Sequence, residues 1–208
     1  MISVITKAKS CRAFAACLLF SAVLLLSQGS ARADTITFEF DPLGLYPSGL
    51  QSVQSSLVRF SATGIGAVAV SENFGSEFLG TRGLAVSGSP DVHLVMDFAV
   101  PVNSVGLWFG NDEPTATSPP LNTAILQVFF NDVLVGQTTL EMNRNDIMDQ
   151  RISFSGTQFN RAIFFFSQEL FLTETVDNVD FSVPEPTSLA LLGIGIAGMV
   201  TRLRRRVR

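Results

Sequence analysis

The residues best suited to proton-transfer chemistry are a single histidine and a large set of carboxylates. His93 is the only histidine, and Asp97 follows it by four positions in a segment of alternating apolar and polar residues. Side chains four positions apart on a strand share a face, so both belong to the polar face. No Gly-x-Ser-x-Gly pattern accompanies them. The sequence therefore favours a non-enzymatic protein, and the alternative is a glycosidase-type pair of carboxylates.

Three acidic residues near the two ends of the central region have the chemistry of a cation site. Glu39 lies in the alternating segment 35–40, and Asp177 and Asp180 lie in the last such segment. Carboxylate oxygens are ligands that Ca²⁺ prefers. Many jelly-roll carbohydrate-binding modules resemble this arrangement, with Phe-Glu near the start and Asp-Asn-Val in the last strand. The resemblance implies that the two ends lie side by side around a structural calcium; the alternative is exposed carboxylates at alternating strand positions.

Aromatic residues that could stack on sugar rings are few. The central region has one tyrosine, Tyr46, and one tryptophan, Trp108, but holds all of the chain's 18 phenylalanines except Phe14 and Phe20. Phenylalanine at this density mostly builds core. Tyr46 and Trp108 are therefore the candidate ligand-contact residues, and sugar binding itself is an expectation from fold analogy.

Charge is distributed unevenly along the chain. All of its 18 acidic residues except Glu185 lie in residues 34–183, which contain five arginines and no lysine, a net charge of 5 − 17 = −12. A domain this acidic repels nucleic acid and anionic lipid. It suits cations or neutral glycans as partners.

The hydrophobic pattern of the central region has a period of two, which predicts half-buried strands. Asn131-Asp132 between two apolar segments predicts a hairpin turn. Many short strands without a helical period predict an all-β, antiparallel, jelly-roll-like sandwich. We expect its strands at 35–40, 57–62, 66–71, 84–87, 92–98, 102–109, 123–130, 133–141, 151–155, 162–167, 170–173 and 176–183.

The first 33 residues have the three parts of a secretory signal peptide. Basic residues precede an apolar segment at 13–26, which leads to an A-x-A cleavage site, Ala31-Arg32-Ala33. We expect the mature chain to begin at Asp34. Both cysteines fall in the removed segment, so the mature chain has no thiol. A lipoprotein-type site at Cys17 is disfavoured because most of the apolar segment follows it.

The last 25 residues combine a proline-rich segment, a short apolar segment and a basic end. An α-helix over 187–203 would reach about 25 Å, against a hydrocarbon core of about 30 Å, so it is a marginal membrane helix. The positive-inside rule keeps its basic end in the cytoplasm. Pro184 and Pro186 disfavour helix and leave an extended segment suited to a protease. The residues that define this tail are Pro184, Glu185, Pro186, Arg202, Arg204, Arg205 and Arg206.

This tail closely resembles the PEP-CTERM sorting signal of Gram-negative bacteria, also known as an ice-binding-protein C-terminal domain. The resemblance implies recognition by an exosortase, a membrane protease, with cleavage near Pro184-Glu185-Pro186 and delivery of the upstream domain to the cell surface or the medium. An ordinary tail anchor is the alternative, although it needs no Pro-Glu-Pro. Ice binding is not expected, because the chain lacks regular ladders of threonine.

The sequence thus predicts a signal peptide (1–33), a β-sandwich domain (34–183) and a sorting signal (184–208). We expect an exported, non-enzymatic surface or matrix protein that associates with exopolysaccharide, a partner class implied by the tail resemblance. The alternative is a secreted hydrolase that acts on polysaccharide. No cofactor is expected other than the calcium considered above.

Overall fold

The computed structural model describes residues 32–72, 82–87, 92–110, 123–143, 147–167 and 175–184. Residues 32–184 form one compact unit. The expected signal peptide up to residue 31, the strand at 170–173 and the membrane helix at about 187–203 lie outside the described residues. Within the described ranges, no helix is long and apolar enough to cross a membrane.

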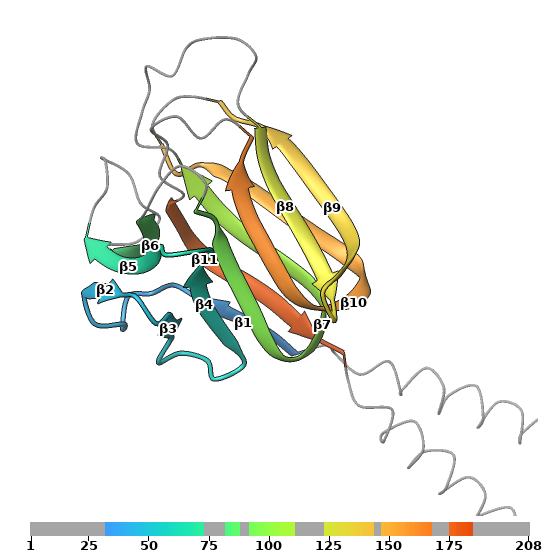
Figure 1. Ribbon diagram of the computed structural model, residues 1–208, viewed down its shortest axis with the longest axis horizontal. Helices are drawn as coiled ribbons and strands as arrows, with labels where there is room; N and C mark the ends of the chain where they lie inside the picture. The colour runs from blue at the N-terminus through green and yellow to red at the C-terminus, as the bar shows by residue number, and fades with distance from the viewer. Residues whose placement is uncertain are drawn as a thin grey trace, which may run out of the picture. The chain divides into compact units, whose positions relative to one another are not determined.

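The described part of the chain is built from strands, and the pairings between these strands are antiparallel. This confirms the predicted all-β antiparallel class (Figure 1). The strands are β1 (Arg32–Ile36), β2 (Gly44–Tyr46), β3 (Leu50–Gln51), β4 (Val58–Ala62), β5 (Ala67–Glu72), β6 (Arg82–Ser87), β7 (Leu94–Gly110), β8 (Thr123–Phe130), β9 (Val133–Glu141), β10 (Gln150–Phe166) and β11 (Thr175–Val183).

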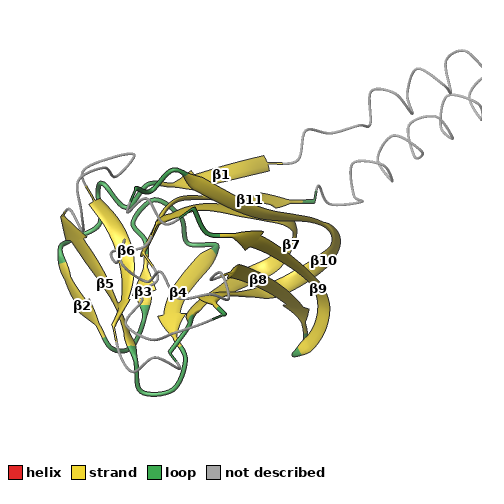
Figure 2. Cartoon of the chain, turned by 90° about the horizontal axis from the view of Figure 1, so that it is seen from above, coloured by secondary structure: helices red, strands yellow, loops and turns green. Residues whose placement is uncertain are grey.

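Two long strands, β7 and β10, run through both layers of the sandwich. The first half of β7 pairs with β4 and with the second half of β10, which in turn pairs with β8. The second half of β7 pairs with β11 and with the first half of β10. We call β3, β4, β8, β9 and the associated halves layer I, and β1, β2, β5, β6, β11 and the other halves layer II (Figure 2).

The sequence divides β7 and β10 each into two expected strands, whereas the structure has one continuous strand of 17 residues in each case. Pro101, which has no amide hydrogen, and the exposed Ala99 interrupt the pattern of β7. Gly156 interrupts β10, where the register shifts between Ser155 and Phe159. These irregularities bend the strands from one layer to the other without ending them.

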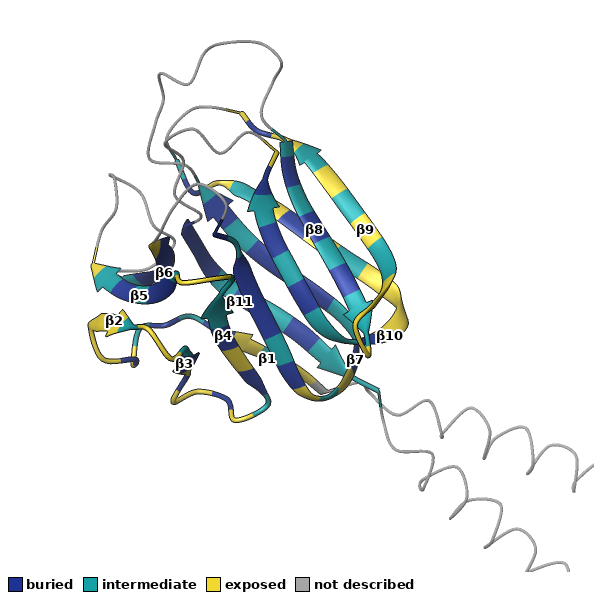
Figure 3. Cartoon of the chain, viewed as in Figure 1, coloured by how far each residue is buried: buried dark blue, intermediate teal, exposed yellow. Residues whose placement is uncertain are grey.

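Phenylalanine side chains join the two layers. Phe98 of layer I lies 5.3 Å from Phe181 of layer II, and Phe109 of layer II lies 5.3 Å from Phe164 of layer I, measured between ring centroids. All four belong to one buried core cluster. Burial alternates along β8 and β10, as the period of two predicts (Figure 3). The predicted hairpin is also confirmed, since Asn131 and Asp132 have φ of 50° and 65°, as a type I′ turn requires.

Candidate functional site

The buried carboxylate of Asp177 is the most unusual polar group in the described part of the domain. Asp177 pairs in register with Trp108 of β7, and the register then shifts before Asp180. The residue in the shift, Asn178, has φ of 46°, and its N–H donates a hydrogen bond of 2.7 Å to Oδ1 of Asp177. Asp177 is fully buried, and its Oδ2 has no hydrogen-bond partner among the described residues. The bulge therefore holds a buried carboxylate, and one of its two oxygens accepts no hydrogen bond from the described residues.

Glu39 approaches Asp177 because β1 runs antiparallel to β11. Ile36 pairs with Val179, and the chain then leaves the extended conformation at Phe38, whose φ is 58°. The expected strand therefore ends at Ile36 instead of Phe40, and Glu39 stands on a turn. Its Oε1 accepts a hydrogen bond of 3.1 Å from the N–H of Arg82.

Burial raises the pKa of Asp177 to about 7, the hydrogen bond from Asn178 opposes this rise, and the negative charge of Glu39 adds to it. The structure thus brings together two of the three residues proposed as metal ligands. A proton or a cation between these carboxylates would relieve the cost of the buried charge. In the described part of the chain, no group of three or more His, Cys, Asp or Glu side chains is arranged to hold a metal ion.

Asp180 is engaged elsewhere. One terminal nitrogen of Arg151 lies 2.8 Å from Oδ1 and 2.9 Å from Oδ2 of Asp180. Both side chains lie above Gly106, where a Cβ atom would collide with them. Asp180 therefore forms a surface ion pair across β7 and does not join Glu39 and Asp177.

The two aromatic candidates are far apart in the sheet. Tyr46 is half-buried in β2, and its hydroxyl donates a hydrogen bond of 2.5 Å to the carbonyl of Pro42. Trp108 is half-buried in β7, between Asp177 on one side and Arg151 on the other. The strands β5, β6 and β11 separate β2 from β7, so the two rings do not form one stacking surface.

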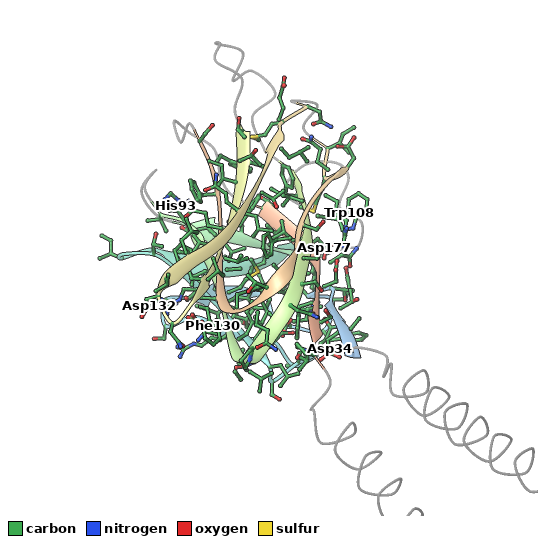
Figure 4. The ribbon with its side chains drawn as sticks, turned by 90° about the vertical axis from the view of Figure 1, so that its right-hand side faces the viewer. Asp34, His93, Trp108, Phe130, Asp132 and Asp177 are labelled. Atoms are coloured by element: carbon green, nitrogen blue, oxygen red, sulfur yellow. The ribbon has the colours of Figure 1, made fainter. Side chains whose placement is uncertain are left out.

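His93 and Asp97 each contact a residue of β10. The imidazole of His93 stacks on the ring of Phe165, with centroids 4.5 Å apart. Asp97 accepts a hydrogen bond of 2.6 Å from Nε of Arg161. Both lie on the outer face of layer I, as the sequence predicts, and Figure 4 shows His93 on the opposite side of the domain from Trp108.

Sequence reasoning missed Asp41, which is fully buried in the connection between β1 and β2. Its Oδ2 accepts a hydrogen bond of 2.7 Å from the hydroxyl of Ser52, and its Oδ1 accepts one of 2.8 Å from the N–H of Val53. This carboxylate therefore ties the connection between β1 and β2 to the connection between β3 and β4, which contains Ser52 and Val53. The only signal was Asp-Pro at the start of a loop, which indicates a turn but not burial.

Comparison with known proteins gives one family match, to the PEP-CTERM protein-sorting motif, at residues 182–206. No curated protein matches the chain. Of the solved structures, the K2 cleaved adhesin domain of Lys-gingipain is 11% identical, with 75% of this chain and 100% of that chain covered and a TM-score of 0.47. The CBM22-1 xylan-binding domain of Paenibacillus barcinonensis Xyn10C is 11% identical, with 76% and 100% covered and a TM-score of 0.37.

The family 11 carbohydrate-binding module of Clostridium thermocellum is likewise 11% identical, with 68% of this chain and 96% of that chain covered and a TM-score of 0.33. At this identity the similarities concern the fold alone. The motif match overlaps the last two residues of β11, and Glu185 and the basic end lie outside the described residues. The chain thus carries a PEP-CTERM protein-sorting motif directly after a β-sandwich that resembles carbohydrate-binding and adhesin domains, and is an exported exosortase substrate.

Proposed function

We propose that this protein is a non-enzymatic component of the cell surface or extracellular matrix whose β-sandwich binds exopolysaccharide. The observation that carries the proposal is the sorting motif at residues 182–206, which begins inside β11. The motif and the sandwich are continuous, so the sandwich is the part delivered by the exosortase-type protease. Before processing, the apolar segment expected to span the membrane at about 187–203 would hold the chain there.

The environments of three carboxylates, Asp97, Asp177 and Asp180, fit binding better than polysaccharide hydrolysis. A glycosidase needs two carboxyl groups that its substrate can reach. Asp177 is fully buried, whereas Asp97 is paired with Arg161 and Asp180 with Arg151. None of these three carboxylates is both accessible and unpaired.

The charge of the domain supports a neutral partner. Residues 34–183 carry a net charge of −12, so a polyanion would meet repulsion over most of the surface. A neutral polysaccharide would not meet this repulsion. The sorting motif suggests the class of partner that we propose, and the charge of the domain favours its neutral members.

We further propose that calcium binds at Glu39 and Asp177 and stabilises the junction of β1 and β11. The unpartnered Oδ2 of Asp177 and the neighbouring charge of Glu39 fit a hard cation. Bound calcium would place a positive charge next to the buried carboxylate of Asp177. Asp180 is excluded from the ligand set by its bond to Arg151.

Co-sedimentation of the processed protein with the exopolysaccharide of its host tests the proposed function. We expect saturable binding in calcium, without release of reducing sugar over the same period. A matched run in chelator tests polysaccharide binding separately from calcium binding. Calcium is proposed to stabilise the fold and not to contact the polysaccharide. Absence of binding in both runs, or release of sugar, would contradict the binding role.

A further inference from the structure

The outer face of layer I is an ordered grid of side chains from five strands. The inward residues of β4, β7, β8 and β10 are fully or almost fully buried, so the alternate residues face outward. The register places Ser61, Val95, Ile163, Gln127 and Gln137 in one row that crosses the strands. With strands about 4.8 Å apart, this row is about 19 Å long.

The rows on either side differ in chemistry. On one side, Arg59 and Arg161 both pair in register with Asp97. On the other side, His93 stacks on Phe165, which pairs in register with Ile125. The central row therefore runs between a charged row and an aromatic row.

The centre of this face carries balanced charge on a strongly acidic domain, and the exposed Glu141, in register with Thr123, lies at its edge. Asp97 is compensated by Arg161 at 2.6 Å, and the exposed Arg59 lies on its other side. Arg161 also contacts Asp132 at 2.5 Å, from the hairpin between β8 and β9. A neutral polymer can therefore approach this face without the repulsion that acidic surfaces impose on a polyanion.

An apolar group lies next to two amides at the scale of a sugar ring. Ile163 is half-buried, whereas Val95 beside it is buried, so Ile163 is the apolar group that a ligand can reach. Nε2 of Gln127 donates a hydrogen bond of 2.9 Å to Oε1 of Gln137. That bond uses one donor and one acceptor, so each amide keeps hydrogen-bonding capacity for a ligand. A pyranose presents an apolar ring face and a rim of hydroxyls, which match these two kinds of neighbour. A protein interface core would instead be depleted of charge and broadly apolar.

From this juxtaposition we propose that the outer face of layer I binds a neutral polysaccharide chain laid across the strands, with a ring face on Ile163 and hydroxyls on Gln127 and Gln137. The inference rests on the proposed function and assigns it to one face. Trp108, on the other side of the domain, takes no part.

The test compares variants of the processed protein by co-sedimentation with the neutral and the anionic fractions of the host exopolysaccharide. The double variant Gln127→Ala/Gln137→Ala removes amide contacts from half-buried and exposed positions without opening the core. We expect its affinity for the neutral fraction to fall about tenfold or more. Ile163→Lys places a charge in the centre of the row and should abolish binding. Trp108→Ala is the matched control and should bind as the wild type does.

The outcomes separate this inference from the proposed function. If the wild type binds and the Gln127→Ala/Gln137→Ala variant binds equally well, the polysaccharide lies on another face and the inference fails while the proposed function stands. Binding to the anionic fraction alone has the same consequence. If Ile163→Lys dissociates a dimer in sedimentation velocity, the face pairs with a second copy and the inference fails. If the wild type binds neither fraction, both fail.

Discussion

At the scale of single residues, Asp177 links the stability of the domain to pH. Burial disfavours the charged carboxylate and raises the pKa of Asp177 from its ordinary value of 3.8 to about 7 in the folded protein. The folded state therefore holds this proton more tightly than the unfolded chain does. The contribution of Asp177 to stability is full below about pH 4 and is lost as the pH rises through about 7.

We predict that, without calcium, the Tm of the domain falls by a few degrees between pH 5 and pH 8, and that Asp177→Asn removes this fall. Calcium should restore the wild-type Tm at pH 8 and should leave Asp177→Asn unchanged. Thermal melts followed by circular dichroism measure both effects. Asp180→Asn is the control from the same strand. Parallel pH profiles for wild type and Asp177→Asn would show that the carboxylate does not titrate in this range.

At the scale of elements, the two bent strands hold the layers together, and a glycine controls how closely β9 approaches β10. A Cβ atom at Gly136 would overlap the ring of Phe154, whose centroid lies 5.8 Å from that of the buried Phe159. The Phe154 ring covers the glycine where β9 meets the first half of β10. The missing side chain at position 136 is therefore part of the packing.

We predict that Gly136→Val destabilises the domain by about 1–3 kcal/mol, because the ring must move from its place. Chemical denaturation measures the loss. In a Phe154→Leu background the cost should be smaller, since the smaller side chain leaves room. An equal cost in both backgrounds would assign the effect to the strand backbone and not to the ring.

The strands also show which parts of the structure the sequence alone can predict. The hairpin at Asn131-Asp132 and the strand 133–141 were predicted correctly, because a type I′ turn and a period of two are local signals. The continuity of β7 and β10 was not, because a bend through Pro101 or Gly156 has the same local signal as a strand end. Register between distant strands leaves no trace in composition. The row through Val95 and Gln127 could therefore not be predicted.

At the scale of the whole molecule, the class of fold and the sorting tail follow from the sequence, whereas the partnership of side chains does not. The phenylalanine content and the alternation of apolar and polar residues predict an all-β core. The ion pair of Asp180 with Arg151 depends on strand order, so the sequence alone could not show that Glu39, and not Asp180, lies next to Asp177. A site formed by residues from both ends of the domain can be identified only once the fold is known.

We predict that replacing Pro184, Glu185 and Pro186 by alanine leaves the precursor in the membrane fraction, because the protease no longer recognises an extended proline-flanked segment. Intact-mass measurement of membrane, surface and medium fractions would show an uncleaved tail. Thr201→Ser, within the same motif match, is the control and should be processed normally. Normal cleavage of the triple variant would place recognition elsewhere in the tail.

The antiparallel pairing of β11 with β1 on one side and β7 on the other also has a mechanical consequence. A load applied at Val183 acts along the length of β11. Backbone hydrogen bonds on both flanks then resist it together, in shear, instead of opening one after another. A domain held at this end and pulled through its broad outer face would transmit force through a strand that is paired on both sides.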